Sequence, residues 1–193
     1  MTFILKSGTT GSTAEVDSNN RLQTFATSET SSTFAAVNGN AFNINTESIT
    51  LTSANASSLL YLLNTDVLDW SLNRVFYNAE VSTGGSGRWL AEVLANPTTG
   101  TLVSGGVATT PHNLNFGSAN ALNATALKGA EGSTLTNGTV RVSTIVPASG
   151  TRVLISFDSI ILTPGSSIGV RITPPAGNTS MELQVGINLH RIA

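Results

Sequence analysis

The sequence of 193 residues contains no cysteine and few charged residues of either sign. The absence of cysteine excludes disulfide bonds and thiolate metal sites. Lysine and arginine together number 9 and aspartate and glutamate 11, so that charged residues make up only 10% of the chain. Acid–base and nucleophilic catalysis need clustered ionisable groups, whereas here they are spread thinly. The composition therefore favours a protein that packs against other chains over an enzyme.

Basic residues are also too scattered for a nucleic-acid partner. Lys6 and Lys128 are the two lysines, and the net charge is −2. Binding to the phosphate backbone depends on clustered lysine and arginine, so no nucleic-acid partner is expected. Long apolar runs are missing too, since no window approaches the roughly 20 apolar residues of a membrane helix. Residues 1–12 do not resemble a secretory signal, because their apolar run is too short and their lysine follows that run instead of preceding it.

What the sequence does contain is a series of short strand-like segments. Residues 72–83 place Val75, Tyr77 and Ala79 on one face, as expected for a half-buried strand. Breaks at Gly, Pro and Asn recur about every 10 to 14 residues, which predicts an all-β antiparallel β-sandwich or jelly roll in one domain. The other predicted strands are residues 48–52, 58–65, 88–97, 139–147, 152–164, 167–175 and 181–192.

Two local predictions accompany this fold. The glycine-rich residues 84–87 join two predicted strands and predict a β-hairpin between them. Abundant Thr, Ser, Asn and Gly disfavour helices, so no helix longer than two turns is expected. A short helix is expected near residues 119–127, where Ala and Leu cluster.

The N-terminal residues differ in composition from the rest of the chain. Residues 1–45 are polar with isolated apolar residues, and they are expected to form an extended N-terminal arm beside a β-sandwich domain of residues 46–193. An edge strand with long loops inside one domain is the alternative. Phenylalanines along the arm are predicted to anchor a partner protein. These candidate partner-binding residues are Phe3, Phe25, Phe34 and Phe42.

A second unusual region, residues 98–137, is a long loop-like stretch. Loops of this length in a compact β domain are usually functional or held by a partner. We therefore expect it to have a role beyond joining two strands.

Candidate catalytic carboxylates have weak support. Asp66 and Asp69 could form a glycosidase pair, but no third group supports them and a solvated turn explains both. Glu80 and Glu92 could face each other across the predicted hairpin, where like charges directly opposite are destabilising. No catalytic residue is predicted, and the chain is expected not to be an enzyme.

Other catalytic and ligand-binding motifs are also missing. His112 and His190 lie far apart, and no G-x-S-x-G elbow exists to position a serine nucleophile. Residues 84–88 lack the ending of a phosphate-binding loop. Neither a zinc cluster nor a calcium loop is present, so no metal and no cofactor is expected.

Four large aromatic residues leave a carbohydrate-binding alternative open. If exposed together they could stack on sugar rings, as in jelly-roll lectins and phage receptor-binding heads. Large aromatic residues in strands more often fill the core, and that is the prediction here. The four are Tyr61, Trp70, Tyr77 and Trp89.

Several phrases of the sequence resemble small structural proteins of tailed phages. These phrases lie in residues 10–26, 96–105, 127–134 and 174–187. The resemblance implies a capsid decoration (cement) protein, which often forms a trimer with a β-sandwich or jelly-roll body and clamps neighbouring major capsid subunits. It therefore implies a phage virion structural protein on the outer surface of the capsid, with the major capsid protein as its partner and a homotrimer as its state.

The physical chemistry of interfaces fits that role. Interfaces are depleted in Lys, Glu and Asp, and a modest contact repeated around a shell gains avidity. A trimer also covers sheet edges that would otherwise template aggregation, and this chain has few lysines to protect them. The alternative function is a receptor- or carbohydrate-binding head of a phage tail or fibre, and a glycan hydrolase is a third.

Overall fold

The structure is a computed structural model that describes residues 15–16, 22–23, 31–85, 87–147 and 151–192. It is mostly β, with 55% strand and 8% helix. The chain divides into two compact units, Met1–Thr30 and Ser31–Ala193. In the first unit, β1 (Glu15–Val16) pairs antiparallel with β2 (Leu22–Gln23).

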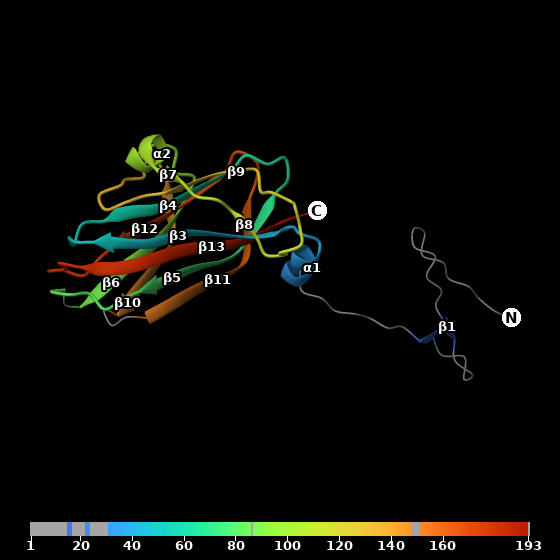
Figure 1. Cartoon of the computed structure of the whole chain (residues 1–193), viewed down its shortest axis with the longest axis horizontal. Helices are drawn as coiled ribbons and strands as arrows, with labels where there is room; N and C mark the ends of the chain where they lie inside the picture. The colour runs from blue at the N-terminus through green and yellow to red at the C-terminus, as the bar shows by residue number, and fades with distance from the viewer. Residues whose placement is uncertain (1–14, 17–21, 24–30, 86, 148–150, 193) are drawn as a thin grey trace. The chain divides into compact units, whose positions relative to one another are not determined.

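The second unit is a sandwich of two antiparallel sheets (Figure 1). Eight strands pair in the order of a jelly roll: β3 with β13, β4 with β12, β5 with β11 and β6 with β10. In this arrangement the first of the eight strands along the sequence pairs with the last, the second with the seventh, and so on inward. This nested pairing is that of a jelly roll and confirms the predicted fold. The strands are β3 (Ala41–Leu51), β4 (Ser57–Asn64), β5 (Trp70–Ala79), β6 (Arg88–Ala95), β10 (Thr139–Pro147), β11 (Thr151–Leu162), β12 (Ser167–Thr173) and β13 (Met181–Arg191).

Residues 98–137, predicted to be a long loop, instead extend both sheets. They contain α2 (Thr101–Gly105), β7 (Val107–Ala108), β8 (His112–Asn113) and β9 (Ala124–Lys128). One sheet therefore has the order β11-β5-β13-β3-β8, and the other has the order β10-β6-β12-β4-β9-β7.

The core lies between the sheets and is built by alternating side chains. Val75 and Tyr77 of β5 point inward and are fully buried, as their spacing predicts. Tyr77 meets Trp89 of β6 edge to face, with ring centroids 5.9 Å apart. Trp70 and Tyr61 are also buried, so the prediction that the large aromatics fill the core is confirmed.

Strand β4 is buried on both faces. On its outer side, Tyr61 packs with Leu102 of α2 and with Leu135 in a separate small cluster. The short helix α2 thus covers the outer face of β4, which explains why this strand is almost continuously apolar.

Two local predictions are wrong. Strand β5 lies in one sheet and β6 in the other, so residues 80–87 cross between the sheets and do not form a β-hairpin. Residues 119–127 form no helix: residues 119–123 have no regular structure, and residues 124–127 belong to β9, which pairs antiparallel with β4. The two helices of the described residues, α1 (Ser31–Val37) and α2, span seven and five residues. Neither exceeds two turns, as expected.

The sandwich also begins earlier than residue 46. Its compact unit starts at Ser31 with α1, and β3 starts at Ala41. Phe42 and Ile44 alternate inward on β3 and are fully buried. Residues 31–45, assigned to the arm from the sequence, therefore belong to the sandwich unit.

Candidate interaction surface

One end of the sandwich gathers exposed apolar side chains. Of the 13 large hydrophobic residues that are exposed in the described part of the chain, seven lie on α1 and on the loops and terminal residue that meet at this end. We call this surface the apolar end. It consists of Phe34, Val37, Val67, Leu68, Leu114, Phe116 and Ile192.

Hydrogen bonds bring the segments of the apolar end together. Leu114 N donates to Ala41 O at 2.9 Å, which joins the loop after β8 to the start of β3. Ile192 N donates to Asp69 O at 2.8 Å, which joins the residue after β13 to the loop before β5. In Figure 1, α1, β8 and the C-terminus accordingly lie at the same end of the sandwich.

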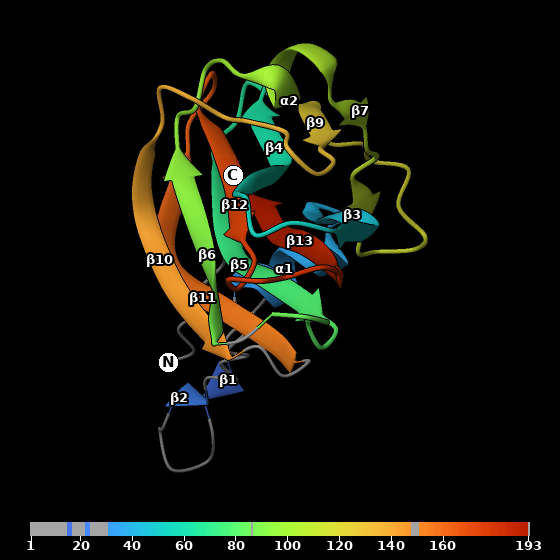
Figure 2. The same ribbon diagram turned by 90° about the vertical axis from the view of Figure 1, so that its left-hand side faces the viewer.

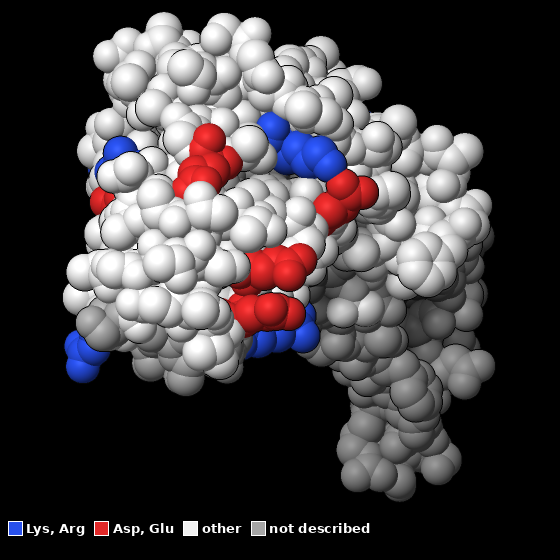
Figure 3. All heavy atoms as spheres, turned by 60° about the vertical axis from the view of Figure 1, so that its left-hand side comes forward, with Lys and Arg blue, Asp and Glu red and all other residues white. Residues whose placement is uncertain are grey.

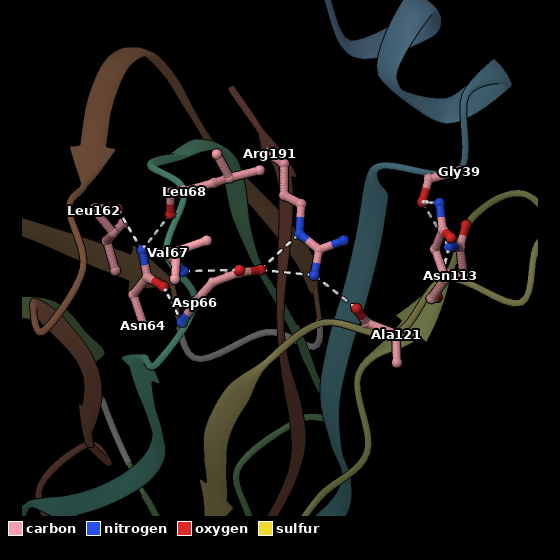
Figure 4. A network of polar contacts seen from close by, with 10 residues as sticks. Gly39, Asn64, Asp66, Val67, Leu68, Asn113, Ala121, Leu162 and Arg191 are labelled. Atoms are coloured by element: carbon pink, nitrogen blue, oxygen red, sulfur yellow. Dashed lines mark hydrogen bonds and ion pairs between the residues drawn. The ribbon is translucent and has the colours of Figure 1, made fainter. Parts of the chain in front are cut away.

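A buried ion pair supports this end from beneath (Figure 4). Arg191 Nη2 lies 2.6 Å from Asp66 Oδ2, and the two side chains are 14% and 5% exposed. The same Nη2 donates to Ala121 O at 2.7 Å, and the Arg191 guanidinium lies 5.4 Å from the centre of the Phe42 ring. One side chain therefore connects β13, β3 and two loops.

Asp66 is held in its charged form by this environment. Burial by itself raises the pKa of the carboxyl, but the Val67 N–H, at 2.8 Å, and the Arg191 guanidinium outweigh it. The net result is a pKa below the ordinary value of an aspartate. The predicted solvated turn at Asp66 is therefore wrong, because its carboxylate is buried; Asp69 is exposed.

A second polar cluster fixes the loop that carries Phe116. Asn113 Nδ2 donates to Gly39 O at 2.9 Å and to Asn120 O at 3.0 Å. Gly39 has φ +68°, and a Cβ there would lie 2.2 Å from Ser118 Oγ, so glycine is required. Because the loop is bonded to the residues after α1, its apolar side chains are presented on a rigid support.

Asn64 plays the same part for the neighbouring loop. Its buried side-chain amide donates to Leu68 O at 3.0 Å and to Leu162 O at 2.8 Å. Its Oδ1 accepts a hydrogen bond from Asp66 N at 2.9 Å. These hydrogen bonds hold the loop in place although its Val67 side chain is 87% exposed.

The predicted partner-binding phenylalanines are divided by the structure. Phe34 is 60% exposed and lies on the apolar end. Phe42 is fully buried in the core, so its assignment to partner binding is corrected. Phe3 and Phe25 lie outside the described residues. Phe116, which is 100% exposed, was missed, although an aromatic residue in a turn of Asn and Gly is a signal that could have found it.

The remaining candidate residues do not assemble into a catalytic site. Glu80 directly follows β5, whereas Glu92 lies in β6 of the other sheet and accepts a hydrogen bond from Arg171 Nε at 2.7 Å. His112 is exposed, whereas His190 is buried with its Nδ1 2.8 Å from Asn73 Oδ1. Within the described residues, no group of three or more His, Cys, Asp or Glu side chains could hold a metal ion.

The wider surface is poor in charge. In Figure 3, charged side chains occupy a few small areas, and most of the face in view is uncharged. In the part of the chain that the structure describes, no helix is both long and apolar enough to cross a membrane.

Comparisons with known proteins place the chain in no family. No protein-family model matches it, and no curated protein is similar to it in sequence. Among solved structures it is similar to a chain in the structure of infectious bursal disease virus, Gx strain, with a TM-score of 0.24 and 12% sequence identity. The match covers 80% of this chain and 35% of that one. For the Gt strain the TM-score is 0.22, with 9% identity over 79% of this chain and 42% of that one. Because these TM-scores are low, the fold assignment rests on the strand order alone.

Proposed function

We propose that this protein is a virion structural protein that decorates the outer surface of a phage capsid. In this proposal the apolar end docks on the major capsid protein. The observation that carries the proposal is the set of exposed apolar side chains on the hydrogen-bonded segments at one end of the sandwich. Exposed apolar side chains gathered on one part of a folded domain point to a site of interaction with protein or membrane.

The composition of the apolar end supports a protein partner. The charged residues nearest to it are Asp66 and Arg191, which neutralise each other in a buried pair, and the exposed Asp69. A surface with few charges and central aromatic side chains resembles the core of a protein–protein interface. Phe116 and Phe34 are then the anchors of the contact.

Repetition on a symmetric shell would strengthen such a contact. A decorating protein needs no deep pocket, because many modest contacts act together once copies are joined. We propose a homotrimer as the joined state, since cyclic oligomers match the symmetry axes of a shell. An enzymatic role is not part of the proposal.

One observation favours the alternative of a carbohydrate-binding head. The outer face of the β11-β5-β13-β3-β8 sheet carries a shallow hollow of about 440 Å³. Amide, carboxylate and guanidinium groups line it, and such groups bind sugar hydroxyls. The polar residues are Ser48, Asn78, Glu80, Arg152, Glu182 and Gln184. The buried aromatic residues weigh against this alternative, since none of the four can stack on a sugar.

Co-sedimentation with capsids that lack the protein tests the proposal. We expect saturable binding at a fixed ratio to the shell, unchanged by free glycans. Loss of binding in the presence of one glycan, or no binding to the shell at all, would contradict the decoration role. In the first case Arg152→Ala, in the hollow, should remove the glycan effect.

A further inference from the structure

The edge strands on the two sides of the sandwich differ greatly in length. On one side the edge strands are β7 and β8, of two residues each. On the other side the edge strands are β10 and β11, of 9 and 12 residues. Figure 2 shows β10 and β11 running along the same side of the sandwich. Long edge strands present unpaired N–H and C=O groups to another chain.

The long edges carry only part of the usual protection against pairing. Neither β10 nor β11 contains lysine, and the proline of β10 is at its end. Val140 and Ile145 of β10 are exposed, as are Leu154 and Ile161 of β11. Soluble proteins usually protect such edges with charges, proline, β-bulges or short strands. Arg141, Arg152 and one register shift in each strand supply some of this protection, but the exposed apolar side chains make this side a candidate for being covered.

A small apolar pocket opens between the sheets on the same side. Its volume is about 90 Å³, and it lies where both edge strands break register, at Val140/Val142 and at Ser156/Ile160. That volume is about three times the share of one water molecule in the liquid, enough for part of an apolar side chain. Its lining includes Arg141 from β10, Ile160 and Ile161 from β11, Val93 from β6 and Ile168 from β12.

An added strand would fill this pocket. A strand paired with the open edge of β10 points alternate side chains into the space between the sheets, which is where Ile160 and Ile161 line the pocket. Recognition by strand addition works in this way: backbone hydrogen bonds give affinity and pockets for alternate side chains give specificity.

The chain itself has one segment available for this purpose. Residues 1–30 belong to a different compact unit from the sandwich, and β1 and β2 pair only with each other within the described residues. The segment contains the run Phe3-Ile4-Leu5, whose aromatic and β-branched residues favour a strand. A stretch of this length can span up to roughly 100 Å when extended, enough to reach a neighbouring molecule.

We propose that the open edge of β10 receives the N-terminal segment of a second copy of this chain, with one apolar side chain of that segment in the pocket beside Ile161. Each copy then donates one segment and accepts another. This is a head-to-tail contact, which closes into a ring when its rotation permits. The inference rests on the proposed association of copies and not on the contact with the shell.

Truncation tests the inference in the absence of any shell. Sedimentation of the full chain should show an oligomer, whereas residues 31–193 should sediment as a monomer with an unchanged circular dichroism spectrum in the β region. A peptide of residues 1–30 should bind the truncated protein saturably. A monomeric full chain, or a truncated protein that still forms the same oligomer, would overturn the inference.

A matched pair of substitutions locates the contact. Ile145 on β10 is 60% exposed and Val107 on β7 is 61% exposed. Ile145→Lys should weaken binding of the 1–30 peptide at least tenfold, and Val107→Lys should leave it unchanged. Equal effects of the two substitutions would contradict the assignment to β10. If Ile145→Lys does not fold, a competition experiment tests the role of the segment itself. Excess free 1–30 peptide should then dissociate the full-length oligomer, and an oligomer that persists would contradict the inference. Loss of shell binding with the oligomer intact would affect the proposed function alone.

Discussion

Arg191, at the end of the last strand, lies 2.6 Å from Asp66, in the loop between β4 and β5. The two residues are 125 positions apart, and both are largely buried. Through its bond to Ala121 O, Arg191 also holds the loop after β8. This pair is therefore one of the contacts that hold the loops of the apolar end in place.

Asp66→Asn should destabilise the fold by about 3 kcal/mol, because it removes the counter-ion of the largely buried Arg191 guanidinium. Chemical denaturation at neutral pH measures this loss. Asp69→Asn is the matched control, since Asp69 is exposed in the same loop, and it should change the stability little. An Asp66→Asn protein as stable as the wild type would contradict the role given to the pair.

The same pair predicts a dependence on acid. The pKa of Asp66 is lowered in the folded state, so its contribution is present above the ordinary aspartate pKa of about 3.9. The contribution is lost as the pH falls through the lowered value, because the unfolded state then binds the proton more readily. Unfolding free energies measured from pH 6 to pH 2 should fall less steeply for Asp66→Asn than for the wild type.

His190 predicts a second effect at milder pH. Burial lowers the pKa of this histidine, so the neutral ring is the form that the fold stabilises. Its contribution is present above the ordinary histidine pKa of about 6.5 and is lost as the pH falls through the lowered value. His190→Gln should flatten the melting temperature between pH 7 and pH 5, whereas the same substitution at the exposed His112 should not.

Tyr77→Phe should preserve or raise stability, by up to about 1 kcal/mol. Its hydroxyl is buried and has no hydrogen-bond partner among the described residues, and an unsatisfied buried group costs free energy. The ring contact with Trp89 remains in the variant. Thermal denaturation checks this prediction, and a clear loss of stability would show that the hydroxyl has a partner.

Gly186 and Phe76 should be coupled. A Cβ on Gly186 would lie 2.0 Å from Phe76 Cζ, so Gly186→Ala should cost about 1–3 kcal/mol by overpacking. Because the conflict is with a single ring, Phe76→Ala should remove most of that cost. A double-mutant cycle measures the coupling, and additive effects would contradict the close contact.

The strand faces could be predicted from the sequence because they depend on local alternation. Val75, Tyr77 and Trp89 are buried as their spacing indicates, and repeated turn signals were enough for the sandwich class. The hairpin at residues 84–87 was wrong because a glycine-rich connection serves equally to pair two strands or to cross between sheets. Which of these occurs depends on partners distant in sequence, here β11 and β10.

The candidate site was harder to predict for a related reason. Asp66 was interpreted as a solvated turn residue because its partner, Arg191, is distant in the chain. Phe42 was interpreted as an anchor because the polar residues around it resemble an arm, whereas β3 buries it. The apolar end itself combines four separate segments, and no local pattern shows that they meet.

The most direct test of the account is shell binding by two matched substitutions. Val37 and Val81 are both 65% exposed, but Val37 lies on the apolar end. Val81 follows Ala79, which pairs with Leu183 at the opposite end of β13 from Arg191. In co-sedimentation with capsids lacking the protein, Val37→Asp should weaken binding at least tenfold and Val81→Asp should leave it unchanged. Unchanged binding by Val37→Asp, or equal loss in both variants, would contradict the proposal that the apolar end holds the shell.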